Sequence, residues 1–362
     1  STEGKPWKRA RRMMQPAFRS DPVRDVAAVT ANIWQTMADE WLSKAGQPIE
    51  INNETQFLAL NVILKALSGT SLDRQTSDRF GAAVKEGLYR IRKRNTSLFP
   101  APVWAPTANN RALQKIRQDL DAFLGPFVSA RQKDSEGDDM LSALARARDD
   151  QGHPFTHEEL LSQTKTLFAA GFETTATALA WTLCELSEHP DLCERLAEEA
   201  NEAEIHLRVD SSSFDRLPLA GRVVDEILRL YPSVYNLGRQ CIADDSAPHS
   251  NGEEYSIPEN TTVLISIWGM HRSSSWGPQA EAFDPDRWLP DHNPSRSSYM
   301  PFAAGKHTCI GNHFSLVELR LAIALICQRF TWILAPGTRK PKPLARITPV
   351  PDGPISLVIV PR

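Results

Sequence analysis

The feature that most constrains the fold is one long apolar helix predicted near the middle of the chain. Thr156 and Glu159 form a capping box, which marks a helix start. Pro190 ends the pattern, because the residue before a proline is disfavoured in the helical region. About 30 residues at a rise of 1.5 Å give roughly 45–50 Å of helix, enough to cross a whole domain. Residues 167–180 at its centre are nearly all apolar or small, so we expect burial on most faces.

Apolar residues recur at helical spacing along most of the chain, and strand and turn signals become common only after Pro232. Further helices are predicted at residues 25–42, 57–67, 111–131, 219–230 and 312–330. Short strands are predicted within 255–267, and the tail 347–360 is expected to form a hairpin around Pro351-Asp352-Gly353. The sequence has no internal repeat and no composition break. The expected fold is therefore mainly α with small β-sheets, in a single domain over residues 1–362.

Composition excludes several classes of protein. The 362 residues carry a net charge of -3, which argues against nucleic-acid binding. The five cysteines are widely spaced and include no CxxC pair, so neither a disulfide framework nor a zinc site is expected. A reducing, cytoplasmic compartment fits this cysteine usage. The chain has no run of about 18 apolar residues, so we expect no membrane span within it.

One cysteine lies in a distinctive loop. The segment Phe302-Ala303-Ala304-Gly305-Lys306-His307-Thr308-Cys309-Ile310-Gly311 places Cys309 between two glycines and directly before a predicted helix. A helix N-terminus favours a thiolate, and glycines let the backbone approach a flat ligand. His307 offers a donor to an anionic group beside the sulfur. The alternative is a buried structural cysteine.

A second motif, Ala170-Gly171-Phe172-Glu173-Thr174-Thr175, interrupts the apolar centre of the long helix. Polar groups in such a helix are costly unless they are hydrogen-bonded, and an internal glycine costs about 1 kcal/mol relative to alanine. A local loosening of the helix would free a carbonyl and make room for a ligand. The alternative is that the threonine hydroxyls donate to the preceding turn.

A third motif combines Glu226-Ile227-Leu228-Arg229 with the later Pro285-Asp286-Arg287-Trp288. Glu226 and Arg229 are three residues apart and share one helix face. Alone, such a pair is a weak signal, because surface pairs of this kind contribute little.

Taken together, these motifs resemble those of the cytochrome P450 family. The spacing F-x-x-G-x-x-x-C-x-G, the small-Gly-x-acid-Thr motif and the E-x-x-R pair occur in the family's order, from Trp7 to the tail. The resemblance implies a haem-thiolate monooxygenase, with haem b between the long central helix and the helix that follows the cysteine loop. Cys309 would be the iron ligand. Ala303 stands where the family often has Gly, Ser or Asn, and we expect little consequence because alanine is small.

The resemblance also implies roles for other residues. Thr174 would be the alcohol and Glu173 the acid that together manage proton delivery during oxygen activation. Glu226, Arg229 and Arg287 would form a buried network that holds the Cys309 loop. The residues implied to contact the cofactor, the first four at its propionates, are Trp7, Arg11, Arg239, His307, Phe302, Gly311 and Ala170.

The substrate pocket is expected on the same side of the central helix as Thr174. Thr166, Ala170 and Thr174 are spaced i, i+4 and i+8 and therefore share a face. The expected lining residues are Thr166, Ala169, Ala170, Val234, Tyr235 and Asn236. Small residues on the helix favour a bulky, largely apolar small molecule as substrate.

The implied reaction uses O₂ and inserts one oxygen atom into an organic substrate. No flavin or nicotinamide domain fits in the sequence, so electrons would come from a separate ferredoxin or flavoprotein reductase. The basic run Lys8, Arg9 and Arg12 is either a solvated surface or part of a docking face for an acidic partner.

Two alternatives stay open at this point. One is a peroxide-using haem-thiolate enzyme, although such enzymes often lack the acid-Thr pair present at Glu173-Thr174. The other is a non-catalytic haem-binding protein. In the family the Trp7-x-x-x-Arg11 helix sits well inside the domain. We therefore expect the N-terminal part to be missing or shortened, and a membrane anchor in that part stays open.

Overall fold

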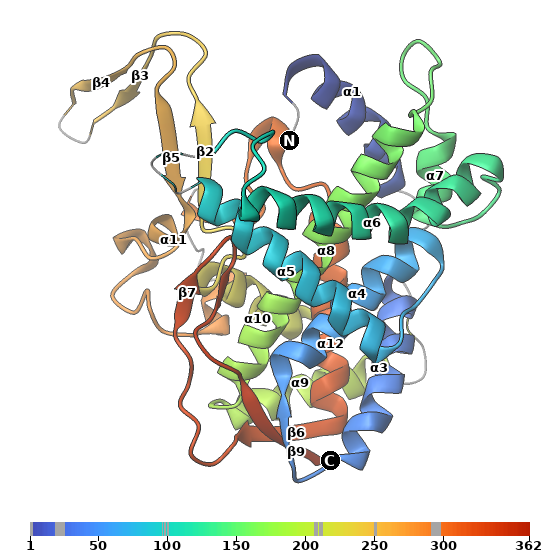
Figure 1. Ribbon diagram of the computed structural model, residues 1–362. Helices are drawn as coiled ribbons and strands as arrows, with labels where there is room; N and C mark the ends of the chain where they lie inside the picture. The colour runs from blue at the N-terminus through green and yellow to red at the C-terminus, as the bar shows by residue number, and fades with distance from the viewer. Residues whose placement is uncertain are drawn as a thin grey trace.

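The computed structural model of the chain describes residues 3–18, 26–95, 97, 99, 101–205, 209, 213–249, 252–290 and 298–362. It is mainly helical with small sheets, as the sequence predicts (Figure 1). The longer helices are α1 (Gly4–Met14), α3 (Val26–Ser43), α4 (Ile51–Ser68), α5 (Arg74–Asn95), α6 (Ala108–Lys133), α8 (His157–Leu186), α9 (Pro190–Glu202), α10 (Pro218–Leu230) and α12 (Asn312–Arg329). The short ones are α7 (Met140–Arg146) and α11 (Ile267–Met270), with 3₁₀ turns at Gln15–Phe18, Ser274–Trp276, Pro285–Trp288 and Gly305–His307.

The predicted central helix is confirmed as α8. Glu159 N–H donates to Thr156 Oγ1 over 3.2 Å, and Thr156 N–H donates to Glu159 Oε2 over 2.8 Å, which completes the capping box. Its C-terminal half is almost wholly buried, and it packs against α4, α6, α10 and α12. The predicted helices at 57–67, 111–131, 219–230 and 312–330 fall within α4, α6, α10 and, to within one residue, α12. That at 25–42 corresponds to α3, and residue 25 itself lies outside the described residues.

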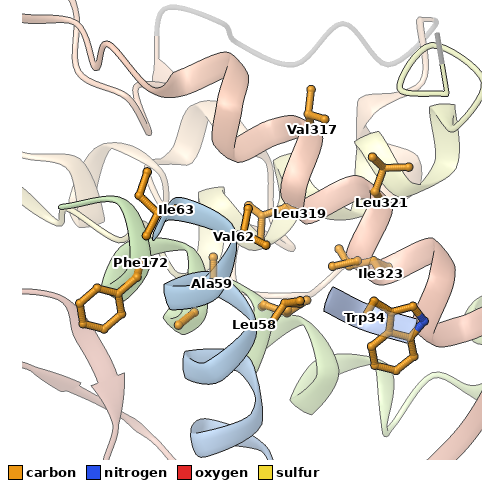
Figure 2. Packing of buried hydrophobic residues seen from close by; sticks show 14 of the residues in the cluster. Trp34, Leu58, Ala59, Val62, Ile63, Phe172, Val317, Leu319, Leu321 and Ile323 are labelled. Carbon is orange, nitrogen blue, oxygen red and sulfur yellow. The ribbon is translucent and has the colours of Figure 1, made fainter. Parts of the chain in front are cut away.

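The core forms where α4, α8 and α12 meet, and α4 is buried on nearly every face. Figure 2 shows side chains at this meeting point, namely Leu58, Ala59, Val62 and Ile63 of α4, Phe172 of α8, Trp34 of α3 and Val317, Leu319, Leu321 and Ile323 of α12. This packing sets the position of α8 relative to the start of α12, and the candidate site lies between those two elements.

Small antiparallel sheets flank the helices. One sheet has the order β1 (Pro48–Glu50), β9 (Ser356–Pro361) and β6 (Phe330–Leu334). The two-stranded sheets pair β2 (Asn236–Gln240) with β5 (Thr262–Ser266), β3 (Asp245–Pro248) with β4 (Glu254–Ile257), and β7 (Pro343–Ala345) with β8 (Pro349–Pro351). Among the helices that the structure describes, none has the length and apolar character that crossing a membrane requires.

The predicted tail hairpin around Pro351-Asp352-Gly353 is wrong. The strand before this turn, β8, pairs with β7, whereas the strand after it, β9, pairs with β1 and β6. The three-stranded sheet buries Leu357 and Ile359, at 1% and 0% exposure. The pairing of strands depends on which arrangement buries their alternate apolar side chains. A turn motif in the sequence does not predict that arrangement.

Candidate cofactor and active site

A cavity of about 330 Å³ lies between the middle of α8 and the loop that precedes α12. Cys309 lines one side of it, and Ala170, Gly171 and Thr174 of α8 line another. Most of the other lining side chains are apolar, including Ile63 of α4 and others from α10, α12 and β2. The cavity therefore combines one thiol, one hydroxyl-bearing helix and an apolar wall.

The Cys309 loop is held by its own backbone. Cys309 N–H donates to Phe302 O over 2.9 Å, and Gly305 adopts the left-handed region with φ of 72°. The Cys309 side chain opens into the cavity and is therefore accessible, although protein atoms surround the sulfur on its other sides. Burial by the surrounding protein raises the pKa of the Cys309 thiol, whereas the N–H of Gly311 and the charge of Arg11 act to lower it. The helix N-terminus thus acts on the sulfur as expected, but burial outweighs it.

Ala303 has more consequence than the sequence suggests. Its φ of 59° lies in the left-handed region, although it carries a Cβ. That conformation costs a residue with a Cβ roughly 1–2 kcal/mol, and glycine adopts it freely. The backbone conformation therefore strains Ala303, and the small size of alanine does not remove that strain.

Helix α1 lies against the Cys309 loop. The rings of Trp7 and His307 stack with centroids 4.0 Å apart, and Arg11 Nη2 donates to Thr308 O over 2.8 Å. His307 also lines the cavity. Three of the predicted cofactor contacts are thus brought to one edge of the cavity, beside Cys309.

The remaining predicted cofactor contacts fall into two groups. Phe302, Gly311 and Ala170 line the cavity. Arg239 does not line it, and its Nη1 donates to Gly238 O over 2.8 Å. Leu237, two residues earlier on β2, does line the cavity. Residues two apart on a strand share a face, so Arg239 lies on the face that continues from the cavity wall.

Of the two alternatives for the motif at residues 170–175, the structure shows no loosening of the helix, because α8 is uninterrupted over His157–Leu186. Thr174 Oγ1 donates to Ala170 O over 2.7 Å, and Thr175 Oγ1 donates to Gly171 O over 3.0 Å. Both threonine hydroxyls therefore donate hydrogen bonds to backbone carbonyls of the preceding helical turn. Gly171 has a packing reason instead, since a Cβ there would lie 2.9 Å from Ile63 Cγ1 of α4.

Glu173 and Thr174 open into different cavities. Glu173 lines a second cavity of about 360 Å³ on the other side of α8, together with Lys85 and Arg346. Thr348 Oγ1 donates to Glu173 Oε1 over 2.9 Å. Burial raises the pKa of the Glu173 carboxyl, while the Thr348 hydrogen bond and the charges of Lys85 and Arg346 act to lower it. Glu173 and Thr174 point in different directions because consecutive side chains on a helix are about 100° apart. The carboxyl and the hydroxyl therefore face different cavities.

The predicted Glu226–Arg229 pair is fully buried. Arg229 donates from Nε and Nη2 to the two Glu226 oxygens over 2.8 and 2.7 Å. Arg287 Nε lies 3.5 Å from Glu226 Oε1, and Trp288 Nε1 donates to Glu226 Oε2 over 3.0 Å. Asp284 N–H completes the set, donating to Glu226 Oε1 over 3.0 Å. The three predicted residues therefore do form one network, which we call the Glu226 network.

Two of the six residues predicted to line the substrate pocket lie in the wall of this cavity. Ala170 and Val234 line the cavity, whereas Thr166, Ala169, Tyr235 and Asn236 do not. On α8 the lining face contains Leu167 in place of Thr166. At 3.6 residues per turn, a residue seven positions from Thr174 lies about 20° off its face and one eight positions away about 80° off. The face of α8 that lines the cavity therefore differs from the predicted face by one residue at its N-terminal end.

Other contributors to the cavity were missed by the sequence interpretation. Ile63 and Leu237 line it from α4 and β2, and Ser233 lines it while donating from Oγ to Thr174 O over 3.0 Å. Ile63 is distant in sequence from the rest of the site, whereas Ser233 and Leu237 directly flank the predicted residues Val234, Tyr235 and Asn236.

The basic run on α1 is largely neutralised. Arg9 Nε donates to Asp149 Oδ2 and Arg9 Nη1 to Glu159 Oε1, each over 2.7 Å. Arg12 pairs with Asp150. Arg9 therefore joins α1 to Asp149 and to the first turn of α8, whereas Lys8 and Arg12 are both exposed, as a solvated surface requires.

Comparison with known proteins agrees with the site. The family model "Cytochrome P450" matches residues 1–357. Cyclooctatin synthase of Streptomyces melanosporofaciens is 31% identical, over 98% of this chain and 76% of that protein. Human cytochrome P450 4A11 is 30% identical, over 95% of this chain and 69% of that protein. A crystal structure of a cytochrome P450 (CYP102L1) superposes with a TM-score of 0.85 at 23% identity, covering 100% of this chain and 83% of that one.

The chain therefore belongs to the cytochrome P450 family. It is a haem-thiolate monooxygenase whose cofactor is haem b. The residues present suit that cofactor: a thiol opens into a largely apolar cavity, small residues face it, and Arg11 and His307 lie at its edge.

Proposed function

We propose that Cys309 ligates the haem iron and that the protein oxidises a bulky, largely apolar small molecule with O₂. The observation that carries this proposal is the position of the Cys309 side chain in the cavity wall, with Ala170, Gly171 and Thr174 also in that wall. When bound, haem b supplies the activation of O₂ and the transfer of one oxygen atom to the substrate.

The chain's own residues would hold the cofactor from two directions. Coordination deprotonates a thiol, and the Gly311 N–H and the Arg11 charge stabilise the resulting negative sulfur. Trp7, Arg11 and His307 would bind propionates at one edge of the cavity, joined by Arg239 from β2. Phe302, Gly311 and Ala170 would contact the flat faces of the ring.

The Glu226 network has a structural role in this proposal. Glu226 and Arg229 are 0% exposed and Arg287 joins them from a later segment. We propose that the network fixes the chain between Trp276 and the Cys309 loop, since Arg287 Nη1 donates to Trp276 O over 2.9 Å.

Protons would reach the cavity from the far side of α8. Glu173 has a raised pKa and lines the second cavity with Lys85 and Arg346, which makes it the group that takes up protons there. Thr174 would hold the proton donor on the cofactor side. Because α8 separates the two cavities, transfer between them requires a change of the Glu173 rotamer.

The substrate would lie against Ala170 and Val234 on the cofactor side of α8. Small and apolar lining residues favour an apolar ligand. A ferredoxin or a flavoprotein reductase would supply electrons, and the cytoplasm is the expected compartment because all five cysteines are free thiols.

The test is the spectrum of the reduced protein with carbon monoxide. Wild-type protein should give the absorption band of thiolate-ligated haem, and Cys309→Ser should abolish it. Cys241→Ser is the matched control, because Cys241 lies outside the cavity wall. A Cys309→Ser protein that keeps the band would show that another group ligates the iron.

A further inference from the structure

A buried histidine joins the Glu226 network to the cysteine loop. His271 follows α11 and is 0% exposed. Its carbonyl accepts from Arg229 Nη1 over 2.9 Å, and its ring Nδ1 lies 3.1 Å from Arg229 O. On the other side of the ring, Met300 N–H donates to His271 Nε2 over 2.9 Å. One side chain thus bonds to the network and to the segment that enters the Cys309 loop.

These partners define one tautomer of the imidazole. A backbone carbonyl can only accept, so Nδ1 carries the proton that is donated to Arg229 O. A backbone N–H can only donate, so Nε2 is the unprotonated acceptor of the Met300 proton. Burial lowers the pKa of His271 to about 4, and the nearby charges of Arg229 and Arg272 act in the same direction. The ring is therefore neutral near pH 7.

Among the described residues, His271 is the hydrogen-bonded link between the three network residues and the cysteine loop, while Tyr299 separately donates from its hydroxyl to Asp225 O and Oδ1 on α10. None of the hydrogen bonds that Glu226, Arg229 and Arg287 make in the described part of the chain reaches residues 298–311. Met300 lines the cavity, and its carbonyl accepts from Ala303 N–H over 3.3 Å. Phe302, within the same turn, accepts the hydrogen bond from Cys309 N–H.

We propose that His271 is a positioning residue for Cys309. Its neutral imidazole fixes the Met300 backbone relative to Arg229. The Met300–Ala303 turn in turn fixes Phe302, whose carbonyl accepts from Cys309 N–H. The inference rests on the proposed role of Cys309 as iron ligand. The competing explanation is space filling, because the His271 ring also packs on Tyr299 with centroids 5.3 Å apart.

Three substitutions separate hydrogen bonding from space filling. In His271→Gln the terminal amide reaches the place of Nε2 and can accept from Met300 N–H. In His271→Asn the amide reaches only the place of Nδ1, so it can donate to Arg229 O but not accept from Met300. His271→Phe fills the volume and makes neither bond. His189→Asn is the matched control at a half-buried histidine that packs on Phe283.

The measurements are the ratio of the thiolate band to the inactive band in the reduced carbon monoxide spectrum, and the reduction potential of the iron. His271→Asn and His271→Phe should lower the ratio about tenfold, the size expected for one buried hydrogen bond left unmade, and shift the potential. His271→Gln should retain the wild-type values, because it keeps the bond from Met300 N–H and its backbone carbonyl still accepts from Arg229 Nη1. His189→Asn should retain them as the control. Wild-type values in His271→Asn, or a His271→Gln protein as impaired as His271→Phe, would overturn the inference.

A second measurement covers variants that fail to fold. Nitrogen-15 NMR of the diamagnetic reduced carbon monoxide form of the wild type should show His271 Nε2 unprotonated and coupled through the hydrogen bond to Met300 N–H. A protonated Nε2 would overturn the inference even without a folded variant. A wild-type protein with no thiolate band would overturn the proposed ligand itself, which distinguishes the two failures.

Discussion

The two sides of the cofactor cavity are built in opposite ways. On the Cys309 side, Glu226 accepts hydrogen bonds from Arg229, Trp288 and the Asp284 backbone, and pairs with Arg287. Arg229 is three residues from Glu226, whereas the other three partners lie about 60 residues further along the sequence. On the α8 side, the hydroxyls of Thr174 and Thr175 donate only to their own helix.

The difference indicates that the Cys309 side stabilises the fold and that the α8 side serves the reaction. Removing one member of the Glu226 network leaves a buried charge without its partner, so the structure itself should suffer. Removing a hydroxyl from α8 leaves the helix intact, because its backbone bonds do not depend on the side chain.

The largest effect is expected from Glu226→Ala. Arg229 would remain fully buried without its carboxylate, which costs about 3–5 kcal/mol. Urea unfolding and the haem-to-protein ratio should reveal an aggregated or haem-free protein. Glu281→Ala is the control, because the Glu281 side chain in its pair with Arg272 is 75% exposed and its loss should cost less than about 1 kcal/mol. Soluble, fully loaded Glu226→Ala would show that both sides tolerate change equally.

Thr174→Ala should leave fold, haem content and substrate binding unchanged and alter the reaction. A positioned proton donor typically raises the rate of the catalysed step about 10²–10⁴-fold. Without it, oxygen should leave as hydrogen peroxide while reductant is still consumed. The measurement is the ratio of product formed to reductant consumed. Thr182→Ala is the control and should change this ratio less, because the Thr182 hydroxyl donates to Ala178 O over 2.8 Å in the same way but lies outside the cavity wall. Equal ratios in Thr174→Ala and the wild type would move proton delivery to another group.

Ala170→Phe should block the space above the cofactor. Ala170 lines the cavity, so a phenyl ring there should weaken substrate binding at least tenfold, or about 1.4 kcal/mol, while the haem spectrum persists. Spectral titration with a bound substrate measures the affinity. The same substitution at Thr166, which is exposed and outside the cavity wall, should leave the affinity unchanged. If both variants bind normally, the substrate lies elsewhere.

The smallest effect is expected from Ala303→Gly, on the Cys309 side. Relief of the left-handed φ of 59° exceeds the added flexibility of the unfolded chain, so the free energy of unfolding should rise by about 1 kcal/mol. Ala304→Gly is the control, because Ala304 has φ of -143° and gains nothing from glycine. Ala304→Gly should lower the free energy of unfolding by about 0.4–1 kcal/mol. A destabilised Ala303→Gly would contradict the strain argument.

Motifs contained in one short segment were predicted well. The capping box at Thr156 and Glu159 and the i, i+3 pair of Glu226 and Arg229 depend only on helix geometry, and both are present. The Cys309 loop likewise precedes a helix, α12, as its sequence implies. These features depend on local geometry, which the order of residues specifies.

The directions of side chains across the molecule were predicted less well. Glu173 faces the second cavity with Lys85 and Arg346, and Gly171 serves the close approach of Ile63. Helical spacing says which residues share a face, but it does not say which element covers that face.

The sequence by itself determined the family, the long central helix, the cysteine loop and the partners of the buried ion pair on α10. Only the tertiary structure decided that Glu173 and Thr174 open into different cavities, that Ala303 is strained, and that His271 connects Arg229 to Met300. The physical reason is the separation in sequence between the residues that interact. Motifs and helix faces follow from neighbours in the chain, whereas cavities and hydrogen bonds between distant segments follow from the packing of whole helices around one core.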